Sequence, residues 1–220
     1  MTQADLDVDL SSEPLIFPLG HYIGAYHPED GAPLAYHTIR IGRQPVRLGS
    51  DQELVLWGLA HGDPEDVKRP WTRQDVLKLA DDAEIPDADE LLQELINDDI
   101  IVEVRPGTND AIDFAEAYRV VPMLFGLGPG GTNGSLHRLG LGTQTSIEVD
   151  DLTFELWRLG HLTDDLWTFC DLYGEALRRA GGRAEADTAP ESLLTQVLWD
   201  IQPLLGAQAA YLDTSPALWS

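Results

Sequence analysis

Cysteine is almost absent from the chain: Cys170 is the only one among 220 residues. A single cysteine cannot form a disulfide within the chain, and it cannot supply the several thiolates of a multi-cysteine zinc site. The surrounding run, LWTFCDLYGEAL, predicts a helix in which Cys170 is a small buried hydrophobic residue. We therefore expect neither a disulfide framework nor a metal or other cofactor.

Basic residues are also scarce. The chain has 14 lysines and arginines against 38 aspartates and glutamates, which gives a net charge of −24, and only Lys68 and Lys78 are lysines. A chain this acidic repels nucleic-acid phosphates and anionic membranes, so direct nucleic-acid binding is not expected. The acidity points less to a basic partner than to solubility, GC-rich codon usage or adaptation to high salt.

Long apolar runs are missing as well. No stretch approaches the roughly 18 apolar residues needed to cross a membrane. The first residues, MTQADLDVDLSSEP, lack the basic start and apolar centre of a signal peptide. These features predict a cytoplasmic protein with a flexible lead-in at residues 1–14.

The feature that organises the chain is an internal repeat. The segment 36–61 recurs without a gap at 136–161. Eight positions are identical between the two segments: His37, Gly42, Gln44, Asp51, Leu56, Trp57, Leu59 and His61 recur as His137, Gly142, Gln144, Asp151, Leu156, Trp157, Leu159 and His161. A repeat of this period predicts two copies of one small domain, at residues 15–117 and 118–220.

The first copy begins with strands and continues with helices. Aromatic and β-branched residues predict the strands, at 15–26, 34–41 and 44–48. Ser50 is the predicted N-cap of a first helix, and Glu53 completes its capping box. Thr72 begins a second helix, and Asp87 or Asp89 begins a third. A strand at 100–105 follows, and the apolar run 118–125 is predicted to return beside it as a β-wing.

The second copy repeats this order. Its predicted strands are 120–125, 136–141 and 146–149, with GLGPGGTNG as the first hairpin turn. A one-residue slip is expected in the third strand, because Ile147 and Val149 lie one position off Val46 and Leu48. The remaining predictions are helices at 151–159, 167–179 and 191–202, a polar link at 180–190, and a short final strand at 207–212.

Each copy thus follows the order β-β-β-α-α-α. The predicted fold class is α+β, a tandem duplication of a winged helix-turn-helix domain with a three-stranded meander followed by three helices in each copy.

This pattern resembles the PqqD-like family, also called the RiPP precursor peptide recognition element. The similarity lies in PVRLGSDQELVLWGLAHG, TRQDVLKLA and DADELLQELINDDIIVEV of the first copy, and in SIEVDDLTFELWRLG and ESLLTQVLWDI of the second. It covers about 80 residues of each copy. The duplication, the long loops at 62–70 and 180–190, and Pro203 after the last helix depart from the family's pattern.

The resemblance implies a non-catalytic module that binds an extended peptide or a protein partner. In the family, the peptide adds a strand beside the third strand and lies against the third helix, so that backbone hydrogen bonds give affinity and pockets give selectivity. The implied binding residues are Gln44, Val46, Leu48, Leu92, Leu95 and Ile96 in the first copy, and Ser146, Ile147, Val149, Leu194 and Leu198 in the second. Aspartates at the rim favour a basic ligand: Asp87, Asp89, Asp98 and Asp99. The alternative that the helix leucines are ordinary core stays open.

Two other functions remain open. The first is a winged-helix transcription regulator that acts on DNA or through a protein partner. The predicted recognition helices, DADELLQELINDD and ESLLTQVLWDIQ, contain no lysine or arginine, which opposes contacts with phosphates and bases. The second is a structural assembly module in which the two copies pack together and hide both grooves. A homodimer is compatible with each of these functions.

Other patterns in the chain are interpreted as structural. A GxGxxG match at 126–131 is followed by a strand instead of a helix, so nucleotide binding is not predicted. The repeated histidines, His37 with His137 and His61 with His161, lack further ligands at metal-binding spacing. His61 and His161 end the first helix of each copy, where an imidazolium would stabilise the helix dipole. No nucleophile–base arrangement is evident, so the chain is predicted not to be an enzyme.

Overall fold

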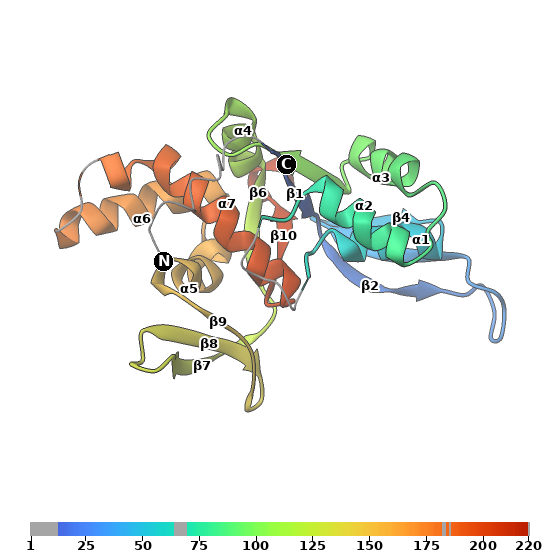
Figure 1. Cartoon of the computed structure of the whole chain (residues 1–220), viewed down its shortest axis with the longest axis horizontal. Helices are drawn as coiled ribbons and strands as arrows, with labels where there is room; N and C mark the ends of the chain where they lie inside the picture. Colours follow the sequence, from blue (N-terminus) through green and yellow to red (C-terminus); the bar gives the residue numbers. More distant parts are fainter. Residues whose placement is uncertain (1–12, 64–69, 182–183, 185, 220) are drawn as a thin grey trace.

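The computed structural model describes residues 13–63, 70–181, 184 and 186–219. Within these residues the chain is an α+β protein with seven α-helices and four small antiparallel sheets (Figure 1). Most of the predicted lead-in, and parts of the two predicted long loops, lie outside the described residues.

The two halves carry the same order of elements, joined by helix α4 (Asn109–Ala117). The first half consists of β1 (Leu15–Pro18), β2 (His21–Tyr26), β3 (Tyr36–Ile41), β4 (Gln44–Leu48), α1 (Asp51–Leu59), α2 (Arg73–Asp82), α3 (Ala88–Asn97) and β5 (Ile101–Val104). The second half consists of β6 (Tyr118–Pro122), β7 (Phe125–Gly130), β8 (Leu136–Leu141), β9 (Gln144–Val149), α5 (Asp151–Leu159), α6 (Leu166–Ala180), α7 (Pro190–Gly206) and β10 (Ala210–Thr214). Three short 3₁₀ turns complete it: η1 (Gly160–Leu162), η2 (Ala186–Thr188) and η3 (Pro216–Trp219).

The predicted helix starts of the first half are confirmed, although the Glu53 carboxylate accepts from the Gly49 N–H at 2.9 Å in place of the Ser50 N–H that a capping box uses. The Ser50 hydroxyl accepts a hydrogen bond from the Glu53 backbone N–H at 3.2 Å, which satisfies one of the free donors at the start of α1. Thr72 begins α2 in a reciprocal capping box with Asp75. Asp87 is the N-cap of α3, with a φ of 52° that aspartate tolerates better than most residues.

Two three-stranded meanders, β2-β3-β4 and β7-β8-β9, form the sheets of the repeat. In each, a glycine with positive φ, Gly42 or Gly142, occupies the first position of the two-residue turn between the last two strands, as in type II′ hairpins. The slip predicted for the third strand is a β-bulge: Leu139 pairs with Ile147 and Gly140 with Thr145, which leaves Ser146 as the extra residue.

Several predicted strands are wrong in their bounds or their partners. Residues 15–26 form two strands, because Gly20, with a φ of 74°, turns the chain between β1 and β2. Most of GLGPGGTNG is strand β7, and the turn begins at Gly131. The wing does not form: β5 pairs with β1, β6 pairs with β10, and α4 lies between β5 and β6. Helix α7 also continues past Pro203, where the prediction ended it.

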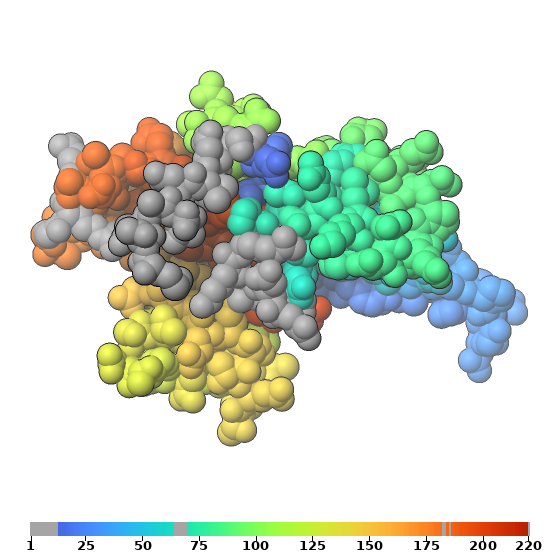
Figure 2. Space-filling view, viewed as in Figure 1, coloured from blue at the N-terminus to red at the C-terminus, as the bar shows by residue number. Residues whose placement is uncertain are grey.

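The two halves share packed side chains at strand β1. Its residues alternate between two faces, as in any strand: Leu15 and Phe17 belong to the larger core cluster with the second half, whereas Ile16 belongs to the first-half cluster. Gln202 of α7 adds polar contacts, because its amide oxygen accepts from the Trp71 N–H at 2.9 Å and its amide nitrogen donates to the Trp71 carbonyl at 2.8 Å. The β2–β3 hairpin and the β7–β9 meander project from this joined body (Figures 1 and 2).

Candidate functional site

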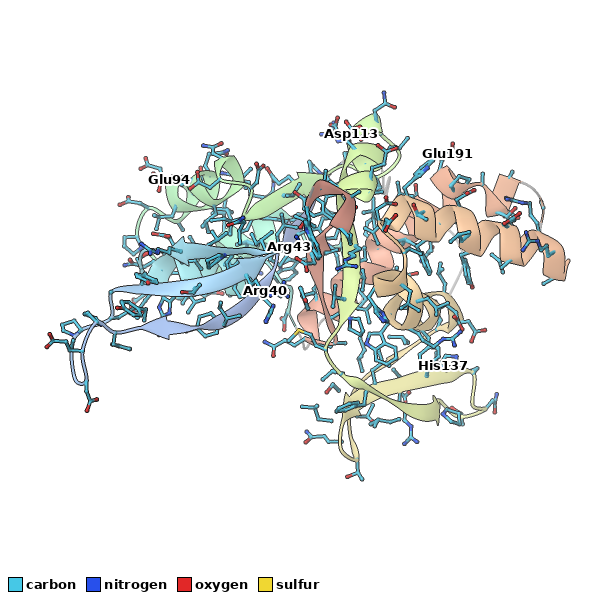
Figure 3. The ribbon with its side chains drawn as sticks, turned by 180° about the vertical axis from the view of Figure 1, so that it is seen from behind. Arg40, Arg43, Glu94, Asp113, His137 and Glu191 are labelled. Carbon is cyan, nitrogen blue, oxygen red and sulfur yellow. The ribbon has the colours of Figure 1, made fainter. Side chains whose placement is uncertain are left out.

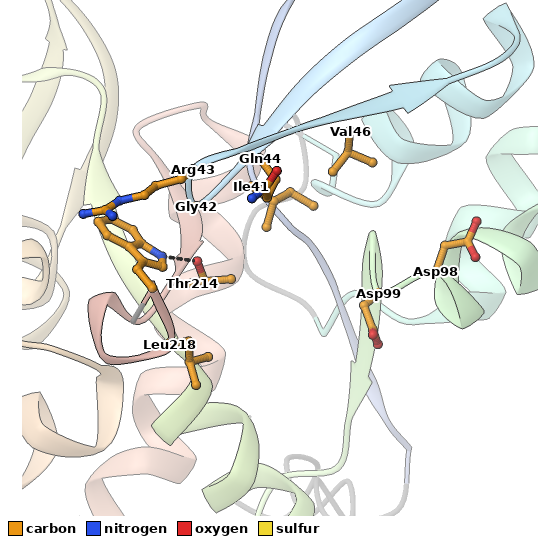
Figure 4. Close-up of a pocket in the computed structure, with 10 residues that line it drawn as sticks. Ile41, Gly42, Arg43, Gln44, Val46, Asp98, Asp99, Thr214 and Leu218 are labelled. Atoms are coloured by element: carbon orange, nitrogen blue, oxygen red, sulfur yellow. Dashed lines mark hydrogen bonds between the residues drawn. The ribbon is translucent and has the colours of Figure 1, made fainter.

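A pocket of about 480 Å³ opens beside β4, between that strand and the turn that follows α3 (Figure 4). This volume is within the roughly 300–1,000 Å³ of ligand pockets. We call it the β4 groove. It is lined by Ile41, Gly42, Arg43, Gln44, Val46, Asp98, Asp99, Thr214, Leu218 and Trp219. The β4 groove therefore takes residues from both halves of the chain.

Two of the predicted binding residues of the first copy, Gln44 and Val46, line the β4 groove. Gln44 is exposed, and Val46 is half-buried against the first-half core. The other predicted residues lie in or against the core instead. Leu48, Leu92 and Leu95 are at most 3% exposed, and the helical spacing of Leu92 and Leu95 turns both toward the first-half core. Ile96 is half-buried and packs on the same core.

The second half has no comparable groove at the predicted residues. Its predicted apolar residues are all buried: Ile147, Val149, Leu194 and Leu198. Of the predicted set only Ser146 is exposed, at the bulge of β9. Helix α7 packs against α5, α6, α4 and β10.

One end of the β4 groove is acidic. Asp98 and Asp99 are exposed where α3 ends, and Asp99 has a φ of 53°. Burial of the Tyr118 hydroxyl, and next the charge of Asp99, raise the pKa of Tyr118. The negative charge of Asp99 thus reaches the Tyr118 hydroxyl at the start of the second half.

The other end of the β4 groove is basic and aromatic. The Arg43 guanidinium carbon lies 5.0 Å from the centre of the Trp219 ring, and Arg119 lies 5.2 Å from the same ring. The Trp219 indole N–H donates to the Thr214 hydroxyl at 2.8 Å (Figure 4). Figure 3 shows Arg40 and Arg43 at the junction of the two halves, away from the acidic periphery marked by Glu94 and Asp113.

The β3–β4 turn is fixed to β10. The Gly42 N–H donates to the buried Asp213 carboxylate at 2.5 Å, and Arg40 donates to the Tyr211 hydroxyl at 2.6 Å. A Cβ on Gly42 would lie 2.4 Å from the Thr214 hydroxyl oxygen, so only glycine fits. At the repeated position, a Cβ on Gly142 would meet no atom within 4 Å, so this docking is particular to the first half.

The repeated histidines, which were the candidates for a chemical role, make contacts within the fold. His37 and His137 each contact an aspartate at the start of the following helix, with Nε2 to Oδ1 distances of 2.7 Å to Asp51 and 2.9 Å to Asp151. The imidazolium expected at His61 is wrong: burial lowers the pKa of His61 to about 4, so its ring is neutral at pH 7.

Besides Ile41 and Gly42 of the β3–β4 hairpin, sequence reasoning missed four lining residues: Arg43, Thr214, Leu218 and Trp219. Only one of them carried a sequence signal, because Arg43 stands where the otherwise similar second turn has Thr143. The other three lie more than 170 residues away and reach the groove through the pairing of β10 with β6.

Two further searches covered the described residues only. No group of three or more histidine, cysteine, aspartate or glutamate side chains there could hold a metal ion. None of the helices in that part of the chain is both long and apolar enough to cross a membrane.

Comparison with protein-family models, with curated proteins and with solved structures finds no match to this chain.

Proposed function

We propose that the chain is a non-catalytic binding module, PqqD-like and built from a duplicated winged-helix unit, that takes up an extended basic peptide or protein segment in the β4 groove. The observation that carries this proposal is the open groove beside an edge strand, with Gln44 and Val46 on one side and Asp98 and Asp99 on the other. Strand addition at such an edge supplies affinity through the backbone, and the groove supplies selectivity.

The backbone of β4 supports strand addition. Ile41 and Gln44 close a two-residue turn, so they form a hydrogen-bonded pair, and such pairs alternate along an antiparallel ladder. Pro45 and Arg47 therefore turn their backbone groups outward, and because Pro45 has no N–H, Arg47 is the outward donor of the two. None of the described groups hydrogen-bonds to the Arg47 N–H, so this donor is available to an added strand.

The charge of the β4 groove favours a basic segment. Asp98 and Asp99 are exposed, and no lysine or arginine among the described residues lies within ion-pair distance of them. The same charge opposes the transcription-regulator alternative, because α3 would be the recognition helix and has no basic residue to meet a phosphate.

The structural-assembly alternative suits the second half only. Leu194 and Leu198 are buried, and Gln202 of the same helix joins the halves through Trp71. In our proposal the second half is therefore a scaffold that supports one working groove in the first.

Peptide binding by paired charge variants tests the proposal. The probe is a fluorescein-labelled, end-capped nonapeptide of alternating lysine and valine, and the measurement is fluorescence anisotropy at low salt. Asp98→Asn with Asp99→Asn should lower the affinity about threefold to tenfold, because two exposed ion pairs contribute roughly 0.2–1 kcal/mol each. Asparagine also tolerates the left-handed backbone at position 99.

The matched control removes the same charge elsewhere. Asp113→Asn with Glu116→Gln, both exposed on α4, should change the affinity less than twofold. Equal losses in the two double variants would mean that the net charge of −24 attracts the peptide without a site, and the proposal would fail.

A further inference from the structure

We propose that the β4 groove selects a peptide with two opposite charges, and that the C-terminal segment Ser215–Trp219 of the second half sets this selectivity. The ligand would place an acidic side chain at Arg43, an apolar side chain against Val46 and Leu218, and a basic side chain at Asp98 and Asp99. This inference rests on the proposed function and specifies its ligand.

Arg43 supplies a cation at one end of the β4 groove. Its side chain is exposed, and no described carboxylate lies within ion-pair distance of it. The Trp219 ring, itself fixed by Thr214, supports the guanidinium at 5.0 Å and reduces its freedom. An arginine held in one place loses less entropy when it binds a carboxylate, and its planar fork matches a carboxylate in two hydrogen bonds.

Leu218 forms an apolar wall of the β4 groove. Leu218 is 62% exposed, yet its backbone is fixed, since its N–H donates to the Ser215 carbonyl at 3.0 Å. Ser215 is fully buried, and its N–H donates to the Ala117 carbonyl at 2.7 Å. A rigid turn therefore holds an apolar side chain at the groove, opposite the half-buried Val46.

The positive and negative side chains of the β4 groove lie at opposite ends. Figure 4 shows Arg43 at one end of the groove and Asp98 and Asp99 toward the other, with Gln44 and Val46 between them along β4. A strand added beside β4 advances about 3.3 Å per residue, so it reaches the two ends with side chains a few positions apart. A lysine-only peptide would fill one end and bring a like charge to the other.

The corresponding turn of the second half lacks the arginine. The turn of that half carries Thr143 where the first has Arg43, and nothing lies within 4 Å of where a Cβ on Gly142 would be. The arginine and the aromatic support beneath it are therefore present at one turn only. Thr143 supplies a control position with the same local geometry.

The experiment compares two end-capped, fluorescein-labelled nonapeptides of one threonine and valine background. The lysine-only peptide carries two lysines near one end. The bipolar peptide carries two lysines near one end and two glutamates near the opposite end, and it is made in two versions, with the lysines at the N-terminal or at the C-terminal end. Wild-type protein should bind one order of the bipolar peptide about threefold to tenfold more tightly than the lysine-only peptide. Arg43→Glu should bring that ratio to one or below, whereas Thr143→Glu, which places the same acidic side chain at the corresponding turn of the second half, should keep it.

A second variant tests the apolar wall. Leu218→Asp should lower the affinity for both peptides at least threefold. Leu172→Asp, at a similarly exposed leucine on α6, should leave both affinities unchanged. Thermal unfolding of every variant shows whether the fold is intact before binding is compared.

The outcomes separate the two proposals. If the lysine-only peptide binds and Asp98→Asn with Asp99→Asn weakens it, but Arg43→Glu keeps the wild-type ratio, the inference of two-ended selectivity is overturned and the proposed function stands. If no peptide binds wild-type protein, both are overturned.

Discussion

The carboxyl group of Asp200, on α7, is buried with no described cation within ion-pair distance. One oxygen accepts from the Gln196 amide at 2.9 Å, and the other has no hydrogen-bond partner in the part of the chain that the structure describes. Burial, with a further contribution from the charge of Asp150, raises the pKa of Asp200 to about 6. The folded protein therefore holds this proton more tightly than the unfolded chain, and the group's contribution to stability falls as the pH rises from about 4 to about 6.

Asp200→Asn should remove this cost. At pH 7 the free energy of unfolding should rise by about 1–3 kcal/mol, because one pKa unit corresponds to roughly 1.4 kcal/mol. At pH 4, where Asp200 is largely protonated in the folded state, the gain should be much smaller. Urea unfolding at the two pH values measures the difference, with Asp171→Asn on the exposed face of α6 as the control. An equal gain at both pH values would show that burial of the charge is not the cause.

At the scale of single residues, the sequence predicted scaffold better than site. Ser50 and Thr72 were found as helix caps because capping is a local interaction between residues three apart, whereas Asp87 occupies the N-cap position of α3 without a side-chain capping bond. The β4 groove could be predicted only in part. Gln44 and Val46 were implied by the family resemblance applied to the predicted strand at 44–48, whereas Leu218 and Trp219 reach the groove through contacts that no local rule describes.

At the scale of elements, the helices of the repeat and the hairpins β3–β4 and β8–β9 were predictable, whereas the bounds of the preceding strands and the pairing of the outer strands were not. Strands β3 and β4 are joined by a two-residue turn, so their pairing is a local property. Strand β1 pairs with β5 across more than 80 residues, and β6 pairs with β10 in the same way. Apolar content indicates that such segments are strands but leaves their partners open, which is why a wing was predicted in place of α4.

Gln202 connects elements of the two halves, and its loss should be costly. Gln202→Ala removes both hydrogen bonds to the Trp71 backbone and one, at 3.5 Å, to the Ile16 carbonyl. The free energy of unfolding should fall by about 1–3 kcal/mol, since the buried Trp71 N–H loses the Gln202 acceptor, whereas the Trp71 carbonyl still accepts from the Ile16 N–H at 3.0 Å. Gln52→Ala, on the exposed face of α1, serves as the control in urea unfolding. A loss below about 0.5 kcal/mol would show that the halves are held together by apolar packing alone.

At the scale of the whole molecule, the duplication is used unequally. Both halves keep the meander, the histidine–aspartate contact and the tryptophan whose indole N–H donates to a backbone carbonyl at 3.0 Å. In the second half, the predicted groove residues on α7, Leu194 and Leu198, are buried, and Gln202 of the same helix contacts the other half. In the first half, the C-terminal turn of the chain builds one wall of the groove. In the proposed function, the second half thus supports and completes the groove of the first.

The central claim is that a peptide binds by adding a strand to β4, and a single backbone change tests it. Arg47→Pro deletes the outward N–H at position 47 while the inward bonds to β3 are kept, and Arg47→Ala controls for the loss of the side chain. With the lysine–valine peptide in the anisotropy assay, Arg47→Pro should bind about tenfold or more weakly, because a lost backbone hydrogen bond and the proline ring both oppose the added strand. Arg47→Ala should bind within about threefold of wild type. Equal affinity of the two folded variants would contradict strand addition at β4.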